Sequence, residues 1–414
     1  MTLLAKSAVG KGGPDAIFQY SDMAEKRAAE VGKENIVNAT LGAILDAEGK
    51  LVTLKAVEES MKSQEFCELA NYAPLKGSPE FMQAVIDVAF GDYKPNSKFA
   101  AIATPGGTGA VHNTFYNYLN PGEICLTTDY CWGNYKTILR EQDCTLQTFN
   151  TFDEQDRFDM TACFAAVDEV AKKQENLMLV LNTPAHNPTG FAVSDEEWDQ
   201  ILEKLTAVAN NGNNNVILLV DIAYIDFAGP QGRSFMKKFE NLPKNFLVIL
   251  AFSMSKGYTL YGYRLGAMIA ISSSQEVIDE FNKANAASAR GTWSNCNQAA
   301  MAVMVDLAQN PEKNAAFRAE QAAFIQSLAN RAKIFTKEAA EVDLRILPYQ
   351  AGFFIMVPAQ DHEQAKAVAA VLREEDIFIV PLGKGLRVAI CAIPEEKITG
   401  MAAKIKKAFQ KIEQ

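Results

Sequence analysis

The sequence has few of the residues that bind metals or form disulfides. Its 414 residues include only 3 histidines and 7 scattered cysteines, an odd number without a CxxC pair. We therefore expect reduced thiols and no metal site. No apolar run approaches the roughly 20 residues of a membrane span, and residues 1–15 lack the long apolar core of a signal peptide. These absences favour a cytoplasmic protein without a membrane partner.

An excess of positive charge is also missing. Lys and Arg number 40 against 50 Asp and Glu, which gives a net charge of −10 at pH 7. Nucleic-acid-binding proteins usually present a basic face, so this balance argues against a nucleic-acid partner. A local pocket for a small anion remains compatible with it. The 48% of hydrophobic residues are ordinary for a globular chain with a large core.

Seven short apolar runs alternate with helical stretches through the middle of the chain. Several are almost entirely apolar, which is typical of parallel strands covered by helices on both faces. Helix-start signals separate them, including Ser78-Pro79 and a capping box from Ser194 to Glu197. The alternation predicts a large, doubly wound α/β domain with a mostly parallel seven-stranded sheet. The expected strands are 99–104, 124–128, 146–149, 177–181, 216–220, 246–252 and 266–271.

The C-terminal part has a different pattern. A long Ala-rich helix is expected from Asn310 to about Ala340, and a last helix ends near Lys411. Between them, strand-like segments predict a smaller α/β domain. They are 344–347, 353–357, 377–380 and 387–390. The first 50 residues have no strand partner nearby, so we predict a large domain of 51–309 and a discontinuous small domain of 1–50 and 310–414.

A glycine-rich loop from Pro105 to Ala110 follows the first predicted strand and precedes a helical pattern. Its backbone N–H groups and the helix N-terminus make it a candidate phosphate site, although a plain strand–helix turn has the same pattern. A dinucleotide site is a weaker interpretation. Asp129 is spaced for a ribose contact, but His112 stands where the third glycine is needed.

Two polar motifs follow other predicted strands. Residues 182–190 end in Asn-Pro-Thr-Gly, which is typical of a turn. They lie where open α/β sheets bind ligands, beyond the carboxyl end of a strand. Asp221 ends another apolar run, where a carboxylate is costly unless it is paired. We expect a cationic partner for it, with a helix cap or a core hydrogen bond as the alternative.

Ser253-Met-Ser-Lys256 directly follows the most apolar strand. Partial desolvation there would disfavour the ammonium form of Lys256 and free its amine for carbonyl chemistry, although a plain surface lysine is the alternative. Arg264, eight residues on, is suited to holding an anion. The Ser-x-x-Lys spacing also matches the nucleophile of penicillin-binding proteins, but their Ser-Asp-Asn and Lys-Thr-Gly motifs do not occur in this sequence.

The order of these motifs, from the glycine loop through Asn187, Asp221 and Lys256 to Arg264, resembles a known family. It is similar to the class I aminotransferases that depend on pyridoxal 5'-phosphate (PLP), and most closely to their aspartate and aromatic amino acid branch. The resemblance runs from about Asn38 to Arg387. It implies the PLP-dependent transferase fold type I and an aminotransferase activity.

The resemblance implies roles for the cofactor-side residues. Lys256 would form the internal aldimine with PLP and move a proton between the substrate α-carbon and the cofactor. Asp221 would pair with the pyridinium nitrogen, while Asn187 and Tyr224 would hydrogen-bond the ring oxygen. Trp132 would stack on the ring, unless it is a core aromatic. The phosphate would be held by Gly106, Gly107, Thr108, Ser253 and Arg264.

On the substrate side, the resemblance implies that Arg387 binds the α-carboxylate bidentately. Gly42 matches a substrate-side glycine loop, and Trp132 and Asn187 would also contact the substrate. Phe354 would line the site, with a plain core position as the alternative.

Two further matches imply a homodimer with shared active sites. Tyr72 would reach the neighbour's phosphate, and Arg290 the neighbour's substrate side chain, with a surface arginine as the alternative. The sequence departs from the aspartate enzymes at Gly106, where a serine is common, and at Tyr135, where a histidine is common. Both differences weaken any transfer of substrate preference.

We therefore expect an aminotransferase that moves the amino group of an L-amino acid to a 2-oxo acid such as 2-oxoglutarate, through a Lys256 aldimine and a pyridoxamine phosphate intermediate. Arg290 favours aspartate or an aromatic amino acid as donor. Another fold type I PLP enzyme, such as a β-lyase, decarboxylase or cyclase, would share the cofactor motifs. A non-catalytic regulator on the same scaffold is a further alternative, and an NAD-dependent dehydrogenase would leave Lys256 without a role.

Overall fold

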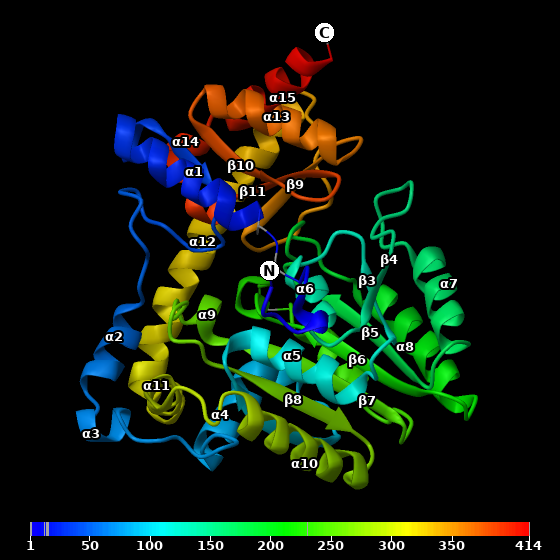
Figure 1. Ribbon diagram of the computed structural model, residues 1–414. Coiled ribbons are helices and arrows are strands. Elements are labelled where there is room, and N and C mark those ends of the chain that lie inside the picture. The colour runs from blue at the N-terminus through cyan, green and yellow to red at the C-terminus, as the bar shows by residue number, and fades with distance from the viewer. Residues whose placement is uncertain (1, 12, 14–15, 230, 414) are drawn as a thin grey trace. The chain divides into compact units, whose positions relative to one another are not determined.

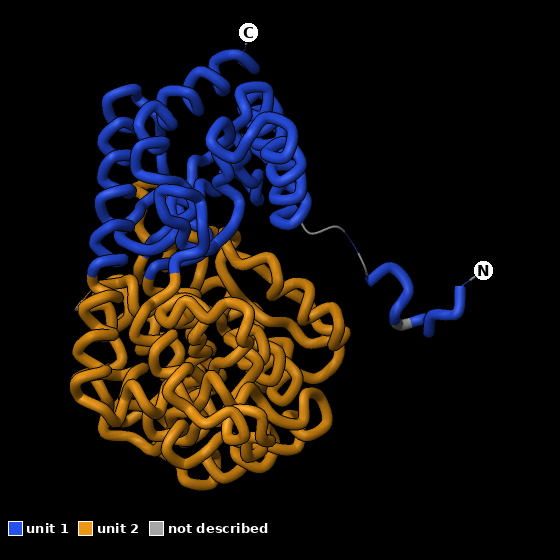
Figure 2. The backbone as a smooth tube through the Cα atoms, turned by 90° about the vertical axis from the view of Figure 1, so that its left-hand side faces the viewer, with its two compact units in different colours: residues 1–52, 185–191, 323–414 blue, residues 53–184, 192–322 orange. Residues whose placement is uncertain are grey.

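The computed structural model describes residues 2–11, 13, 16–229 and 231–413 (Figure 1). Part of the N-terminal stretch considered above as an export signal therefore lies outside the described residues. The chain forms two compact units (Figure 2). Unit 1 comprises Met1–Val52, Ala185–Phe191 and Ala323–Gln414, and unit 2 comprises Thr53–Pro184 and Ala192–Ala322.

The helices of the two units have the following bounds. The α-helices are α1 (Ala16–Val31), α2 (Lys55–Lys62), α3 (Phe66–Leu69), α4 (Pro79–Phe90), α5 (Gly106–Tyr118), α6 (Asn134–Glu141), α7 (Met160–Ala171), α8 (Asp195–Asn210), α9 (Met254–Gly257), α10 (Gln275–Thr292), α11 (Gln298–Gln309), α12 (Pro311–Glu341), α13 (His362–Glu374), α14 (Glu395–Ile398) and α15 (Met401–Ile412). Short 3-10 helices are η1 (Lys6–Ala8), η2 (Lys33–Asn35), η3 (Gly91–Tyr93), η4 (Ile225–Phe227), η5 (Ser234–Phe239) and η6 (Ile390–Ala392).

Unit 2 is built around a seven-stranded sheet, which confirms the predicted fold class and each of the seven predicted strands. In spatial order the strands are β2 (Lys98–Thr104), β8 (Gly266–Ser272), β7 (Phe246–Ser253), β6 (Asn215–Asp221), β5 (Asn176–Asn182), β3 (Ile124–Thr128) and β4 (Thr145–Phe149). β8 runs antiparallel to both of its neighbours, and the other pairs are parallel. The sheet is therefore mostly parallel.

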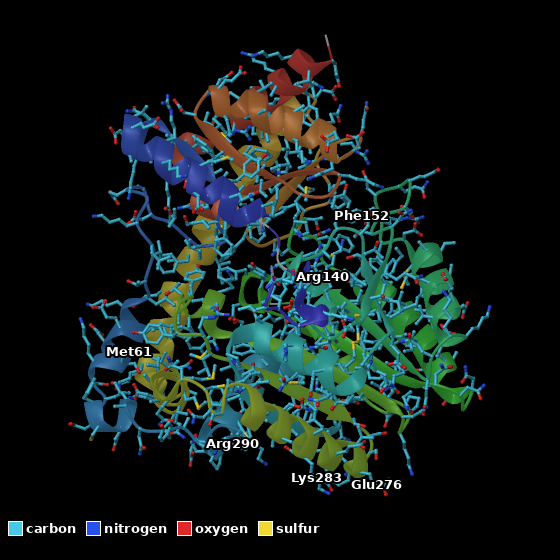
Figure 3. All side chains as sticks on the ribbon, viewed as in Figure 1. Met61, Arg140, Phe152, Glu276, Lys283 and Arg290 are labelled. Atoms are coloured by element: carbon cyan, nitrogen blue, oxygen red, sulfur yellow. The ribbon has the colours of Figure 1, made fainter. Side chains whose placement is uncertain are left out.

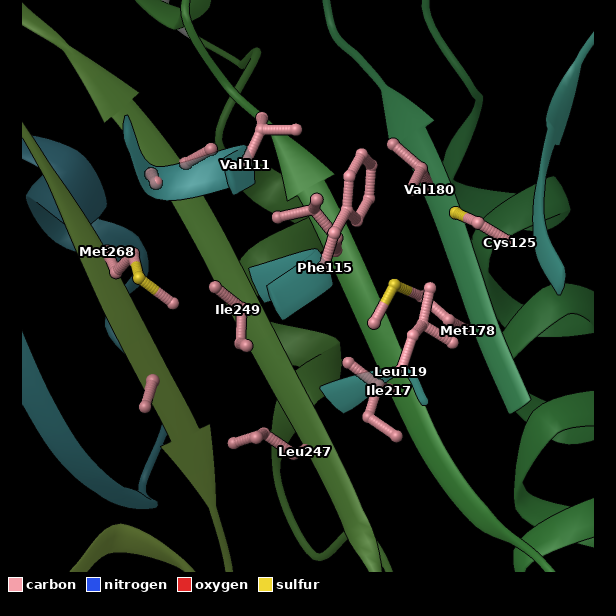
Figure 4. Packing of buried hydrophobic residues seen from close by; sticks show 14 of the residues in the cluster. Val111, Phe115, Leu119, Cys125, Met178, Val180, Ile217, Leu247, Ile249 and Met268 are labelled. Atoms are coloured by element: carbon pink, nitrogen blue, oxygen red, sulfur yellow. The ribbon is translucent and has the colours of Figure 1, made fainter. Parts of the chain in front are cut away.

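Helices cover both faces of this sheet. On one face, Val111 and Phe115 of α5 pack with Met178, Ile217 and other strand residues in one apolar cluster (Figure 4). Successive side chains of a strand point to opposite faces of the sheet. The strand residues that alternate with those of the cluster therefore face the other side, and they are buried as well. The helices α7 and α8 pack against each other and against β4, β5 and β6. Burial on both faces explains why these strands are continuously apolar in the sequence.

The predicted helix starts are confirmed. The Ser78 hydroxyl accepts a hydrogen bond from the Phe81 N–H at the start of α4. At the start of α8, Ser194 and Glu197 form the complete capping box, in which each side chain accepts from the other residue's backbone N–H. These side chains satisfy donors that the first helical turn leaves without intrahelical partners.

Unit 1 contains a four-stranded sheet in the order β1 (Val37–Ala39), β10 (Ile377–Pro381), β11 (Gly385–Ala389) and β9 (Phe354–Pro358). β1 pairs in parallel with β10, and the remaining pairs are antiparallel. The N-terminal segment thus supplies an edge strand to the C-terminal sheet, as its lack of a nearby partner predicted. Residues from α12, α13 and α15, including Phe335, Leu372 and Ile405, cover this sheet in one apolar cluster.

The predicted strand at 344–347 is wrong. The Leu344 N–H donates to the Ala339 carbonyl oxygen at 2.8 Å and so closes the C-terminal end of α12. Further along, the Leu347 N–H donates to the Met356 oxygen at 2.9 Å, but no strand is formed there. The apolar residues in this segment, such as Leu344, fill the unit 1 core instead. The segment is apolar because it is buried, but its backbone does not pair as a strand, and the sequence pattern does not distinguish these two cases.

The unit boundaries differ from the domain boundaries expected from the sequence, 51–309 against 1–50 and 310–414. The second boundary lies inside α12, between residues 322 and 323. The first turns of α12 pack within unit 2, where the Phe317 ring stacks on Tyr258 with centroids 4.7 Å apart. Residues 185–191 join unit 1, because the Gly190 oxygen accepts a hydrogen bond from the Gln350 N–H at 2.9 Å.

Within the described ranges, no helix is both long enough and apolar enough to cross a bilayer. All seven cysteines are free thiols. The same ranges contain no cluster of three or more His, Cys, Asp or Glu side chains arranged to hold a metal ion.

Candidate active site

The glycine loop lies beside the ends of two other strands of unit 2. Strand register aligns Thr104 of β2, Gly266 of β8 and Ser253 of β7 across the sheet. A Cβ added to Gly107 would lie 3.4 Å from the Ser253 Cβ. The loop passes directly into the N-terminal end of α5, whose first turn also contains the half-buried Thr108. Three separate parts of the sequence therefore converge at one edge of the sheet.

Arg264 completes this corner of unit 2. A Cβ added to Gly106 would lie 2.6 Å from Arg264 Nη2, and Gly106 itself has a φ of +69°. The guanidinium donates from Nη1 to the Ser255 hydroxyl at 3.1 Å and to the Tyr261 carbonyl oxygen at 2.8 Å. Arg264 has a φ of +53°, a conformation that costs energy in a residue other than glycine. The backbone therefore holds this cation against the glycine loop, where an anion would be stabilised.

Asp221, at the carboxyl end of β6, is only 6% exposed. Its carboxylate accepts hydrogen bonds from the Tyr135 hydroxyl at 2.7 Å and from the Ala223 N–H at 3.1 Å. Burial raises the pKa of Asp221, and both hydrogen bonds oppose that rise. The expected cationic partner is not found: both donors are neutral, and the described residues form no ion pair with this carboxylate.

Tyr135 is a neutral donor held in place by aromatic packing. Its side chain is fully buried, and burial together with the nearby Asp221 charge raises the pKa of Tyr135 well above its usual value. The hydroxyl therefore stays protonated and donates to the carboxylate. The ring packs edge-on against Trp132, with centroids 5.4 Å apart and planes at 88°. Trp132 is itself half-buried, and this contact fixes its position next to the Asp221–Tyr135 pair.

Lys256 lies in the single-turn helix α9 that follows β7. The Ser253 hydroxyl caps this turn by accepting from the Ser255 N–H at 3.2 Å. The Lys256 ammonium Nζ lies 5.5 Å from the centroid of the Tyr224 ring and 4.8 Å from that of the Tyr261 ring. Two aromatic rings thus lie beside the half-buried Lys256 side chain and restrict its contact with water.

A second group of predicted residues comes together within unit 1. Arg387 on β11 is 2% exposed and donates from Nη2 to the Thr40 carbonyl oxygen at 2.7 Å. Its Nη1 lies 3.4 Å from Asn187 Oδ1, and its guanidinium carbon lies 4.4 Å from the centroid of the Phe354 ring. A buried guanidinium oriented in this way is suited to bidentate binding of a carboxylate. Gly42 is half-buried and lies two residues after Thr40.

The two residues expected to act on a neighbouring subunit lie at the surface. The Tyr72 side chain is 86% exposed. Arg290 lies in the last turn of α10 (Figure 3), is exposed and donates to the Ser294 hydroxyl at 2.5 Å. Neither position is needed to hold the core of its own unit.

Sequence reasoning missed three contributors to these groups. Ser255 bonds Arg264, Tyr261 packs beside the Lys256 ammonium, and the Thr40 carbonyl receives the Arg387 guanidinium. Ser255 stands inside the motif that drew attention to Lys256, so position alone would have identified it. Backbone carbonyls such as that of Thr40 carry no side-chain signal in a sequence.

The residues of unit 2 fit PLP. Because Gly106 and Gly107 have no side chains, Arg264 and Ser253 approach the loop backbone closely, and this corner of backbone N–H groups and a guanidinium suits a phosphate. No cation among the described residues pairs with the buried Asp221 carboxylate, and a protonated pyridine nitrogen would supply one. The Lys256 amine is a nucleophile suited to an aldehyde.

Comparison with known proteins identifies the family. A family model described as aminotransferase class I and II matches residues 34–405. The chain is 38% identical to an aminotransferase from Anaerococcus prevotii, whose crystal structure superimposes with a TM-score of 0.95 over 99% of each chain. An aromatic-amino-acid aminotransferase from Burkholderia pseudomallei, covalently bound to pyridoxal phosphate, shares the fold at 23% identity, with a TM-score of 0.79 over 99% of this chain and 100% of that chain.

Two curated relatives match part of the chain. The aromatic-amino-acid aminotransferase of Paracoccus denitrificans is 30% identical over 62% of this chain and 63% of its own length. The mitochondrial aspartate aminotransferase of Schizosaccharomyces pombe is 27% identical over 65% of this chain and 60% of its own length. The chain thus spans about 60% of the length of the curated relatives it matches. Because the family model and the solved structure from Anaerococcus prevotii agree, the resemblance seen in the motifs is confirmed, and the chain belongs to the aminotransferase class I and II family.

Proposed function

We propose that this protein is a PLP-dependent aminotransferase that moves the amino group of an L-amino acid to 2-oxoglutarate. The observation that carries the proposal is the buried Asp221 carboxylate, whose protein partners are both neutral. A buried carboxylate is costly unless a cation compensates it, and the pyridinium of PLP would supply that cation. Membership of the aminotransferase class I and II family supports the same assignment.

In this proposal, unit 2 is the PLP-binding domain and unit 1 the smaller domain. Gly106, Gly107, Thr108, Ser253 and Arg264 would hold the phosphate, and Trp132, Asn187 and Tyr224 would contact the ring. When bound, PLP supplies an electron sink for the bond broken at the substrate α-carbon.

The protein's own residues would orient the reactants and move the proton. Asp221, kept as a hydrogen-bond acceptor by Tyr135 and Ala223, would hold a proton on the ring nitrogen. Lys256 Nζ would take the proton from the α-carbon and return it, because it is the amine of this site. Arg387 would bind the substrate α-carboxylate, with Gly42 and Phe354 beside the substrate.

We favour aspartate or an aromatic amino acid as the donor. The curated relatives from Paracoccus denitrificans and Schizosaccharomyces pombe carry aromatic and aspartate aminotransferase names, which supports this choice. The exposed Arg290 would bind a distal carboxylate in the neighbouring subunit of a homodimer, and Tyr72 would reach that subunit's phosphate. Their high exposure supports a role outside their own unit.

A cytoplasmic location is also part of the proposal, and the seven free thiols support it. The Schizosaccharomyces pombe relative is named as mitochondrial. Fractionation of the source cells, with the protein recovered in an organelle or membrane fraction as the contrary result, tests the location.

The activity is tested by incubating the purified protein with PLP, 2-oxoglutarate and a panel of L-amino acids. We expect glutamate and the matching 2-oxo acid in equal amounts, and no turnover by the Lys256→Ala variant. Release of ammonia or CO₂ in place of glutamate would instead identify a lyase or decarboxylase with the same cofactor site. Full turnover by the variant would refute the role of Lys256.

Shared active sites are tested by mixing two inactive variants, Lys256→Ala and Arg290→Ala, after partial unfolding. A mixed dimer would contain one site with Lys256 from one subunit and Arg290 from the other. We expect activity toward aspartate to reappear in the mixture. If each variant alone is impaired and the mixture stays inactive although mixed dimers form, Arg290 acts within its own subunit.

A further inference from the structure

Gly257, the residue directly after Lys256, lies against a buried carboxylate. A Cβ added to Gly257 would lie 1.9 Å from Asp226 Oδ2 and 2.9 Å from Asp226 Cγ. Gly257 ends the helix α9, and its φ does not lie in the left-handed region. Its backbone conformation therefore does not require glycine, whereas the close approach of Asp226 does. The carboxylate occupies the space that a side chain at residue 257 would fill.

Asp226 is held in this position from its other side. It lies in η4 and is 8% exposed. Arg233 Nη2 donates to Asp226 Oδ1 at 2.7 Å, and Arg318 Nη1 lies 3.8 Å from the same oxygen. Arg233 is in turn anchored through Nε, which donates to the Ala89 carbonyl oxygen at 3.0 Å. Oδ1 is thus engaged by arginine, while Oδ2 occupies the position that a Cβ at Gly257 would take.

The helix α12 contacts the same residue through its carbonyl group. Gln321 Nε2 donates to the Gly257 carbonyl oxygen at 3.0 Å, and Gln321 Oε1 accepts from Arg318 Nη1 at 2.9 Å. Arg318 therefore links the Asp226 carboxylate and the Gln321 amide, the two side-chain groups that lie against Gly257. We call Asp226, Arg318 and Gln321 the Gly257 clamp. All of its members belong to unit 2.

We propose that the Gly257 clamp positions Lys256, with Asp226 and Gln321 as its positioning residues. A helix of one turn has too few internal hydrogen bonds to hold its own orientation. The clamp fixes the peptide group that follows Lys256, and with it the direction in which the amine leaves the backbone. This inference rests on the proposed function, because it concerns how the lysine amine meets a carbonyl group. A misplacement of 1 Å at a reacting atom can slow a reaction by about 100-fold.

The test separates the reaction of Lys256 from binding at the phosphate corner. The purified apo-protein is mixed with PLP and quenched with borohydride, which reduces the C=N bond that the amine and aldehyde form with loss of water. Mass spectrometry then gives the rate of attachment to Lys256. Affinity for pyridoxine 5'-phosphate, which has no aldehyde, is measured in parallel. Gly262→Ala is the matched control, because a Cβ there meets nothing within 4 Å.

We expect Gly257→Ala to slow attachment by about 100-fold while pyridoxine phosphate binding stays within about twofold of the wild-type value. Gly262→Ala should change neither quantity. In the Asp226→Ala background, Gly257→Ala should have no further effect beyond about twofold, because the clashing oxygen is gone. Unchanged attachment in Gly257→Ala, or an equal slowing in both backgrounds, would overturn the inference.

Gln321→Ala provides a second variant that introduces no clash. It should slow attachment, whereas Gln326→Ala on the exposed part of α12 should not. Equal rates for these two variants would remove Gln321 from the clamp. If the wild-type protein neither binds pyridoxine phosphate nor is trapped by PLP, the proposed function fails instead. The two failures are therefore distinguishable.

Discussion

Replacing Tyr135 with phenylalanine tests whether the Tyr135 hydroxyl stabilises the ionised Asp221 carboxylate. The substitution removes one hydroxyl that donates to the buried carboxylate at 2.7 Å and leaves the Ala223 N–H as its remaining donor. A hydrogen bond to a charged group contributes about 1.5–3 kcal/mol, whereas one between neutral groups contributes about 0.5–1.5 kcal/mol. We therefore expect the apo-protein to lose about 1.5–3 kcal/mol of unfolding free energy while Asp221 is ionised.

The loss should depend on pH in a defined direction. Burial raises the pKa of Asp221 in the folded protein, and the Tyr135 hydrogen bond counters part of that rise. Phenylalanine cannot make this hydrogen bond, so the pKa of Asp221 in the folded protein rises further. The pKa of Asp221 in the unfolded protein stays at about 3.9. The destabilisation is then fully present above the folded-state pKa and becomes smaller as pH falls through it.

Urea unfolding of the wild-type and Tyr135→Phe apo-proteins at several pH values between about 5 and 8 measures this difference. Tyr118→Phe is the control. Tyr118 is half-buried, and its hydroxyl accepts a hydrogen bond from the neutral Asn285 Nδ2 in place of donating to a carboxylate. Its stability difference should not vary with pH in the same way. A Tyr135→Phe difference that stays constant across this range, or matches that of Tyr118→Phe, would refute the reasoning.

Three other predictions concern the phosphate corner, the substrate arginine and a helix start. Gly106→Ala should weaken pyridoxine 5'-phosphate binding more than tenfold, measured by titration calorimetry, because the added Cβ would lie 2.6 Å from Arg264 Nη2; wild-type affinity would contradict the assignment of this corner. Arg387→Lys should raise KM for the amino acid by about 10–100-fold, because one charged hydrogen bond is worth about 1.5–3 kcal/mol; an unchanged KM in steady-state assays would exclude its role. Ser194→Ala should lower the unfolding free energy by about 1 kcal/mol in urea without changing kcat, because it removes the capping box with Glu197; an equal stability would show that the cap contributes nothing.

Most of the fold followed from local patterns. The seven strands of unit 2 were visible because helices cover both faces of the sheet, so that the central strands are almost entirely apolar. The start of α8 was visible because a capping box is a pattern of neighbouring residues. The segment 344–347 shows the limit of this reasoning. Leu344 and Ile346 are apolar because they pack in the unit 1 core, and apolar residues alone do not show whether the backbone pairs as a strand.

The candidate site followed from the sequence only in part. Motifs at strand ends were informative, because parallel strands deliver their carboxyl ends to one edge of a sheet. The partners of those residues were not predictable. Tyr135 and Asp221 are separated by 86 residues, and Arg387 and Asn187 by 200. No local pattern marks a phenol as the donor to a distant carboxylate.

By itself, the sequence determined which residues can carry the chemistry: an amine after a buried strand, a carboxylate at the end of another, and a loop of glycines before a helix. Composition and periodicity are properties of the chain, and they persist in any conformation. Only the tertiary structure decided that Asp221 accepts hydrogen bonds from neutral donors and that the Asp226 carboxylate occupies the Cβ position of Gly257. These contacts depend on where distant segments meet, because burial and hydrogen bonding are determined by neighbours in space and not along the chain.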